Sequence, residues 1–286
     1  MKLAVAIAGA NAIPSAFVVW RGFSESMRKA SELGYHGVEL ALKTADDICV
    51  RDLETWLNRY NLEVSCISTG QVFADLGLYF THPDSEVREK AVEVFDGLIH
   101  LASDYGKLVN VGRARGFIGN GQTRDQAEAL FITTMEAICE KAEKKGVTLI
   151  IEPVNRYEIN FVNSLDEGAA LVKKLKHKNV GLMPDVFHMN IEDDHIGDSL
   201  RRNADLVRYI HFADSNRLAP GQGHLDFDDV FNGLESAGFD GWASIEILAK
   251  PDPDTAARQA AEFILPRIEQ YNKKREDGKG ENKRGS

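Results

Sequence analysis

The chain repeats one pattern along its length: a short run of apolar and β-branched residues, then a loop, then a segment with helical periodicity. The runs are dense in Val, Ile and Leu and do not strictly alternate with polar residues, which is typical of strands buried on both faces. Eight such runs occur, at residues 3–9, 36–42, 63–69, 107–113, 147–153, 179–187, 207–214 and 242–248. Alternating strands and helices predict parallel strands joined by right-handed crossovers.

The helical segments between the runs carry their own start and stop signals. Two of them open with a capping box, Thr123 to Gln126 and Ser164 to Glu167, in which side chains bond the first free backbone N–H groups. Several end in glycine, as at Gly146, where the left-handed backbone conformation stops a helix. These signals predict helices at residues 23–34, 85–106, 123–146, 164–177, 226–239 and 254–274.

Eight strand–helix units are the number that closes a (β/α)8 barrel, and 286 residues is an ordinary length for one. An open doubly wound sheet is the alternative, but no run is followed by the Gly-x-Gly-x-x-Gly fingerprint that such sheets often carry. We therefore predict an α/β fold, a single (β/α)8 TIM barrel over residues 1–272 with its active site at the C-terminal ends of the strands. Residues 273–286 have no apolar face, and we expect them to form a disordered polar tail.

Charge and composition narrow the range of partners and compartments. The net charge of −10 argues against nucleic-acid and anionic-membrane partners, since both select for basic surfaces. No segment approaches the roughly 20 apolar residues of a membrane span. The opening stretch MKLAVAIAGANA is shorter than a secretory signal, and we interpret it as the first strand. Three cysteines that match no zinc or redox motif favour a reducing compartment, so we expect a cytoplasmic protein.

Four predicted strands end on ionisable residues. Glu152, Asp185, His211 and Glu246 each lie inside or just after an apolar run, where an unpaired charge is costly. Lysine and arginine are scarce in those strands, and the C-terminal ends of barrel strands meet at one rim. Separate caps and salt bridges would need four unrelated explanations. The arrangement therefore predicts a divalent cation held by all four residues.

The type of ligand indicates the type of metal. Three carboxylates and one imidazole, without a thiolate, favour Mn²⁺, with Mg²⁺ or Co²⁺ as alternatives, over a structural Zn²⁺. Such ions take about six ligands. Two positions would then remain for the oxygens of a substrate.

Several segments of the second half carry a resemblance to a known family. These are IIEPVNRYEINFVNS, MPDVFHMNIEDD, IHFADSNRLAPGQGHLDF and SIEIL. They resemble the xylose-isomerase-like sugar isomerase/epimerase superfamily and, within it, are similar to ketose 3-epimerases of the D-tagatose/D-psicose type. The resemblance implies that Glu152, Asp185, His211 and Glu246 hold a catalytic divalent metal and that Glu152 and Glu246 are also the acid–base pair.

The resemblance also implies a set of substrate contacts. Glu158, His188 and Arg217 match substrate-contact positions, and Cys66 falls where the family lines its sugar pocket. One departure is the segment GRARGF, which places Arg113 and Arg115 where free-sugar epimerases are more apolar or aromatic. Two arginines at a barrel mouth would clamp a phosphate or a carboxylate. The alternative is that one of them pairs with a structural acid such as Glu39.

The function implied is proton transfer on a keto sugar, most simply C3 epimerisation through a cis-enediolate that the metal stabilises. The alternatives are a lyase that acts on 3-keto glycosides by the same enolisation and an isomerase of a small hydroxy-keto acid or sugar phosphate. Abasic-site endonucleases share the barrel, but they need a basic face and more histidine ligands. A non-enzymatic binding module would need no acid–base pair. Barrels of this kind often assemble as dimers or tetramers, so a homo-oligomer is an open expectation.

Overall fold

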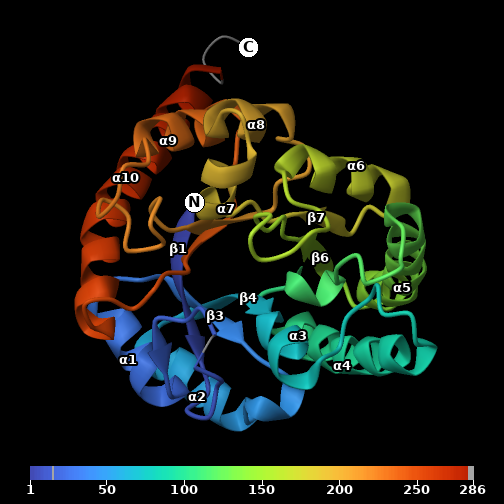
Figure 1. The fold of residues 1–286 in the computed structure, drawn as a ribbon. Helices are drawn as coiled ribbons and strands as arrows, with labels where there is room; N and C mark the ends of the chain where they lie inside the picture. Colours follow the sequence, from blue (N-terminus) through green and yellow to red (C-terminus); the bar gives the residue numbers. More distant parts are fainter. Residues whose placement is uncertain (15, 283–286) are drawn as a thin grey trace.

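Eight parallel strands form a central barrel in the computed structural model, which describes residues 1–14 and 16–282 (Figure 1). Each of the eight predicted runs overlaps one of them, and only β1 begins before its run, by one residue. The strands are β1 (Lys2–Ala8), β3 (Gly37–Ala41), β4 (Glu63–Ser68), β5 (Leu108–Val111), β6 (Thr148–Ile151), β7 (Val180–Leu182), β8 (Tyr209–Phe212) and β9 (Trp242–Ile245). A short additional strand, β2 (Trp20–Arg21), pairs with the end of β1.

The order of the strands shows how the barrel closes. The hydrogen-bonded path runs β7-β6-β5-β4-β3-β1-β9-β8, and every pairing along it is parallel. The remaining seam, between β7 and β8, is joined by two isolated parallel bridges, Leu182 with Val207 and Asp185 with His211. The predicted (β/α)8 TIM barrel is confirmed, and the open-sheet alternative is wrong.

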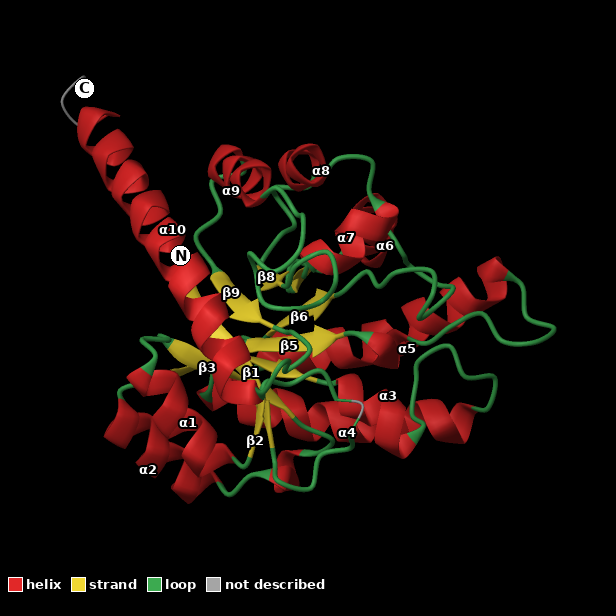
Figure 2. Ribbon diagram, turned by 60° about the vertical axis from the view of Figure 1, so that its left-hand side comes forward, coloured by secondary structure: helices red, strands yellow, loops and turns green. Residues whose placement is uncertain are grey.

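Helices surround the strands, as the red and yellow elements of Figure 2 show. All six predicted helices are present, together with α2, α8 and two short helices, α3 and α7, at strand ends. The bounds are α1 (Phe23–Glu32), α2 (Val50–Tyr60), α3 (Gly70–Leu76), α4 (Ser85–Asp104), α5 (Arg124–Lys144), α6 (Leu165–Leu175), α7 (Val186–Glu192), α8 (Ile196–Arg202), α9 (Phe227–Ser236) and α10 (Pro253–Asn282). Two single turns of 3₁₀-helix, η1 (Ala45–Asp47) and η2 (Arg113–Arg115), complete the set.

One predicted capping box is complete and the other is half formed. At α5, Gln126 N–H donates to the Thr123 hydroxyl and Thr123 N–H donates to the Gln126 side chain. At α6 the Ser164 hydroxyl accepts from Glu167 N–H, but the Glu167 carboxylate accepts from Asn163 N–H instead of Ser164. The Glu167 side chain thus bonds Asn163, the residue before the N-cap Ser164. The helix still begins where it was predicted.

The last helix extends further than the sequence suggests. α10 continues to Asn282, so most of the segment expected to be a disordered tail is helical in the structure. Tyr271 anchors this helix by donating its hydroxyl to the carbonyls of Leu234 and Phe239, and Arg275 pairs with Asp240 at 3.2 Å. Residues 283–286 lie outside the described residues, and a domain boundary at residue 272 stays a prediction. Within the described chain, no helix is both long and apolar enough to cross a membrane.

Candidate active site

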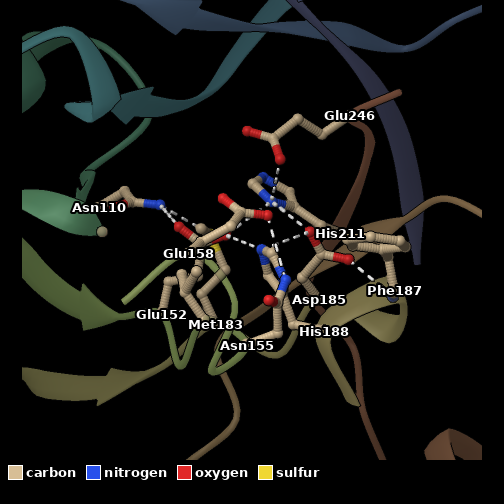
Figure 3. Close-up of polar contacts among 12 residues, drawn as sticks. Asn110, Glu152, Asn155, Glu158, Met183, Asp185, Phe187, His188, His211 and Glu246 are labelled. Carbon is tan, nitrogen blue, oxygen red and sulfur yellow. Dashed lines mark hydrogen bonds and ion pairs between the residues drawn. The ribbon is translucent and has the colours of Figure 1, made fainter. Parts of the chain in front are cut away.

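The four ionisable residues predicted from the strand ends come together at one rim of the barrel (Figure 3). Glu152 directly follows β6, Asp185 lies in the loop after β7, His211 is in β8, and Glu246 directly follows β9. One ligand atom of each residue lies within 4.8 Å of the corresponding atoms of the other three, and all four residues are buried. The barrel therefore brings side chains from four successive strands to a common centre.

The atoms that face this centre lack partners, which is what a cation site requires. The buried Asp185 Oδ2 and His211 Nδ1 have no hydrogen-bond partner among the described residues. His211 Nδ1 is 3.7 Å from Glu152 Oε1, 3.7 Å from Glu246 Oε2 and 4.0 Å from Asp185 Oδ2. These gaps are too long for hydrogen bonds. The donor set, three carboxylates and one imidazole, thus fits a divalent cation placed between them.

The electrostatics of the cluster lead to the same conclusion. Burial raises the pKa of Asp185 to about 6 and the pKa of Glu246 to about 8. Burial opposes the charge of His211, but Glu39 and Glu246 outweigh it and hold the pKa of His211 well above its ordinary value. Burial also opposes the charge of Glu152, yet His211 keeps the pKa of Glu152 below normal. Crowded carboxylates at this depth must be neutralised, either by protons or by a cation.

Glu39, in β3, orients the histidine of the cluster. Its fully buried carboxylate accepts from His211 Nε2 at 2.9 and 3.1 Å and from the Tyr209 hydroxyl at 2.9 Å. The Tyr209 hydroxyl is also 2.7 Å from Ser65 Oγ. Because Nε2 carries the proton donated to Glu39, Nδ1 is the nitrogen that faces the centre, and a cation bound there would displace any proton on it. The alternative that Glu39 pairs with Arg113 or Arg115 is therefore wrong. Glu39 could have been noticed in the sequence, because it is an acid inside an apolar run, as Glu152 and Glu246 are.

Asn110, in β5, supports Glu152, and like Glu39 it was not predicted from the sequence to be part of the site. Its side-chain amide donates to Glu152 Oε2 at 3.1 Å, and the residue is buried. Gly112 lies beside this pair: a Cβ atom there would be 2.7 Å from Asn110 Oδ1 and 2.8 Å from Glu152 Oε2. Glycine at residue 112 thus leaves room for the carboxylate. An amide in the middle of a strand carries no charge signal that would have marked it.

Three of the six predicted substrate contacts line the same pocket as Glu152 and Glu246. They are Glu158, His188 and Arg217. Arg217 Nη2 donates to Glu246 Oε2 at 2.5 Å, and Arg217 Nη1 lies 3.5 Å from Glu158 Oε1 and 3.2 Å from His188 Nε2. The pKa of His188 is well below its ordinary value because the ring is buried and faces Arg217, so the imidazole is neutral. The pocket therefore presents acids, a neutral imidazole and a guanidinium beside the cation site.

Asn155 and two aromatic rings hold His188, Glu158 and Arg217 in place. The Asn155 amide lies 2.7 Å from His188 Nδ1 and donates to Glu158 Oε1 at 3.1 Å. The Arg217 guanidinium is stacked between aromatic rings, with its carbon 4.0 Å from the centre of Phe17 and 4.7 Å from that of Phe187. Stacked and ion-paired guanidinium groups lose little freedom when a ligand arrives.

Two other predicted contacts do not reach the pocket. Cys66 is fully buried inside the barrel with Ile150, Met183 and Tyr209, where burial raises the pKa of its thiol. Arg115 is also fully buried, and it donates to three main-chain carbonyls. A guanidinium so occupied cannot clamp a ligand, so the prediction of substrate contacts at Cys66 and Arg115 is corrected. Arg113 does line the pocket.

Comparison with known proteins places this geometry in a family. An L-ribulose 3-epimerase of Methylomonas sp. is 27% identical over 270 residues, which is 86% of this chain and 92% of that protein. An L-ribulose 3-epimerase of Mesorhizobium japonicum is 33% identical over 159 residues, 54% of this chain; the match spans about half of that protein, 53%. The crystal structure of a 3-keto-D-glucoside 4-epimerase from Escherichia coli superposes with a TM-score of 0.78 at 21% identity, over 93% of this chain and 99% of that one.

The structural likeness, at this low identity, supports the fold alone. The sequence profile of one family, described as the xylose isomerase-like TIM barrel, matches residues 27–267. That range includes all four residues of the cation site. The chain belongs to the xylose isomerase-like TIM barrel family.

Proposed function

We propose that this protein is a metal-dependent keto-sugar epimerase that inverts C3 of a ketose through a cis-enediolate. The observation that carries the proposal is the placement of Glu152 and Glu246 on either side of one centre. Both carboxylates have an oxygen 3.7 Å from His211 Nδ1, yet they come from β6 and β9, which are separated in the barrel by β7 and β8. Epimerisation requires one group to remove a proton and a second group to return it to the opposite face of the carbon.

Each residue has a role that follows from its contacts. Glu152 and Glu246 exchange the C3 proton, and with Asp185 and His211 they hold the ion. The bound ion supplies the positive charge that makes this proton acidic. His188, neutral and buried, accepts from Arg217 through Nε2 and so holds the guanidinium beside the oxygen on which negative charge develops. Arg217 stabilises the same charge and keeps its position through Glu158 and Glu246.

We infer that Mn²⁺ is the ion bound, with Mg²⁺ and Co²⁺ as alternatives, because the donor set is mostly oxygen with one imidazole. We also infer a cytoplasmic protein, which agrees with three cysteines that are free in the structure. A homo-oligomer, dimer or tetramer, remains part of the proposal, and gel filtration coupled to light scattering tests it directly.

Deuterium wash-in from D₂O tests the reaction. The Mn²⁺-loaded protein should place one deuterium at C3 of a free ketose and yield both epimers, as detected by NMR. Label at C1 or C2 alone would indicate an isomerase and would reject the C3 assignment. Turnover of 3-keto glycosides without any exchange in free ketoses would favour the alternative function, which is elimination or epimerisation on a glycoside. The E. coli structural neighbour is a 3-keto-D-glucoside 4-epimerase.

Two substitutions test the acid–base pair. Glu152→Gln and Glu246→Gln should each lower turnover by at least about 100-fold, in line with the usual contribution of a positioned acid or base. Glu89→Gln, at an exposed position on α4, is the matched control and should retain full activity. Circular dichroism checks that the variants fold. Turnover close to that of the wild type in both variants would reject the assignment.

A further inference from the structure

Among the pocket-lining residues that precede β6 in the chain, Arg113 is the only charged one. This wall is built from the segment after β1, the ends of β3, β4 and β5, and α3, and its lining includes Ile13, Ala41, Ser68, Ala74 and Arg113. Most of these side chains are small or apolar. A ligand held at the cation site would extend its remaining atoms toward this wall.

Arg113 is fixed in position by its neighbours. It follows Gly112 at the end of β5, which Figure 2 shows in the barrel, and it opens the turn η2. The same turn is held by the buried Arg115, whose guanidinium donates to the carbonyls of Gly112, Phe161 and Val162. Arg115 N–H also donates to the Gly112 carbonyl at 3.0 Å. The backbone that carries Arg113 is therefore rigid before any ligand binds.

The Arg113 guanidinium is unpaired among the residues that the structure describes. It makes no hydrogen bond or ion pair there, and its one recorded interaction is with the ring of Phe73, at 6.0 Å from the ring centre. The other two arginines at this rim are occupied, Arg115 by main-chain carbonyls and Arg217 by Glu246. Arg113 is half-buried, so its guanidinium is free to pair with a ligand that brings the counter-charge.

The acids of the pocket do not supply that charge. Glu158 accepts from Asn155 and faces Arg217, Glu152 is bonded by Asn110, and Glu246 is paired with Arg217. The guanidinium presents a planar fork of N–H donors, whose geometry matches two oxygens of a carboxylate or a phosphate.

We propose that Arg113 binds an anionic group, a carboxylate or a phosphate, on the part of the substrate that the cation site does not hold. The natural substrate is thus a keto-sugar acid or a keto-sugar phosphate. This inference rests on the proposed function, because it takes the cation site to hold the reacting end of a keto sugar. Arg113 then sets the specificity for the other end.

Calorimetric binding to the Mn²⁺-loaded protein tests the proposal without requiring turnover. The ligands are a neutral ketohexose, the same sugar with a carboxylate at C6, and the same sugar with a phosphate at C6. One of the charged sugars should bind at least ~10-fold more tightly than the neutral sugar, which corresponds to about 1.4 kcal/mol. Which of the two charged sugars binds more tightly distinguishes a carboxylate site from a phosphate site.

Variants of Arg113 separate charge from packing. Arg113→Gln should abolish the preference for the charged sugar, because the affinity for the charged sugar falls far more than the affinity for the neutral sugar, whereas Arg113→Lys should retain part of the preference. Arg51→Gln, at an exposed position on α2, removes the same net charge far from the pocket and should behave as the wild type.

Three results would overturn the proposal: equal affinity for neutral and charged sugars, no binding of any of the three, or an equal loss for all three in Arg113→Gln. The last result would show that Arg113 only balances the acidic pocket. Failure of the proposed function is recognised separately. If deuterium exchange is absent while Arg113-dependent binding of a charged sugar persists, the anion site stands and only the epimerase reaction is rejected.

Discussion

At the scale of single residues, the properties of the site depend on pairs rather than on the four ligands alone. His211 is the clearest case, because Glu39 accepts its Nε2 proton and so leaves Nδ1 free to face the other ligand atoms. A carboxylate behind a metal-binding histidine also makes the imidazole a stronger donor. The Glu39 carboxylate is fully buried, and its charge acts on the cation site through the hydrogen bond to His211.

Removing that charge gives the first prediction. Glu39→Gln should weaken binding of Mn²⁺ by about 10- to 100-fold, the usual effect of losing such a partner. Competition with a chromophoric chelator measures the affinity independently of catalysis. Glu63→Gln, at an exposed carboxylate on β4, is the control and should bind metal as the wild type does. Unchanged affinity in Glu39→Gln would show that the carboxylate only satisfies the buried polar groups around it.

The pH dependence of metal binding follows from the acids of the same cluster. The raised pKa values of Glu246, about 8, and of His211, well above its ordinary value, mean that the metal-free site holds protons at neutral pH, and Asp185, with a pKa of about 6, takes up another in mild acid. The ion must displace those protons, so its affinity should rise as the pH increases from about 5 to 8. Calorimetry in buffers of different ionisation enthalpy should detect proton release on Mn²⁺ binding at pH 6. An affinity that is flat over this range would contradict the raised pKa values.

At the scale of elements, the positions of the strands were predictable and the directions of some side chains were not. Eight dense apolar runs sufficed to identify the barrel, because strands buried on both faces differ in composition from the helices between them. The ends of those runs also carry the four residues that the structure gathers around one centre, where they could hold a cation. Periodicity does not, however, specify whether a residue just beyond a strand points into the mouth or into the wall. Arg113 and Arg115, two positions apart in one turn, illustrate this: one lines the pocket and the other bonds the backbone.

The short helices at strand ends could not be predicted from the sequence patterns either. The run 179–187 was interpreted as one strand, but β7 stops at Leu182 and α7 begins at Val186. Asp185 is the N-cap of α7, and its Oδ1 accepts from Phe187 N–H at 2.9 Å. Its other oxygen, Oδ2, is left to face the cation site. A helix of two turns is too short to produce a clear period, so this dual role becomes visible only in the structure.

The turn after β5 gives the prediction at this scale. Gly112→Ala would place a methyl group about 2.7–2.8 Å from Asn110 Oδ1 and Glu152 Oε2, well inside contact distance. Because both oxygens are buried, the Glu152 carboxylate must shift, and turnover should fall by more than about tenfold, since small misplacements of a reacting group cost much rate. Gly97→Ala, in α4, where an added Cβ meets only Ala45 Cβ at 3.8 Å, is the control. Equal activity of both variants would show that the loop accommodates the methyl group.

At the scale of the whole molecule, the four residues that could hold a cation lie across the seam where the barrel closes. They come from the ends of β6, β7, β8 and β9, and the β7–β8 boundary is held by two isolated bridges, one of which joins Asp185 to His211. Every other neighbouring pair of strands around the barrel is hydrogen-bonded within the one sheet. An ion bound by both residues would therefore stabilise the closure of the barrel as well as take part in the reaction.

Metal removal should consequently lower the stability of the whole fold. At a Mn²⁺ concentration 100 times its Kd, binding to the native state adds about 2.7 kcal/mol, so the Tm should rise by ~5 °C or more over the chelator-treated protein. Hydrogen exchange gives the local test: the amides of Leu182, Arg208 and His211, which cross the seam, should gain protection when the ion binds. Asp185→Asn should lose most of both effects, because it removes a ligand from this boundary. Protection confined to other strands would place the ion away from the seam and contradict the assigned ligands.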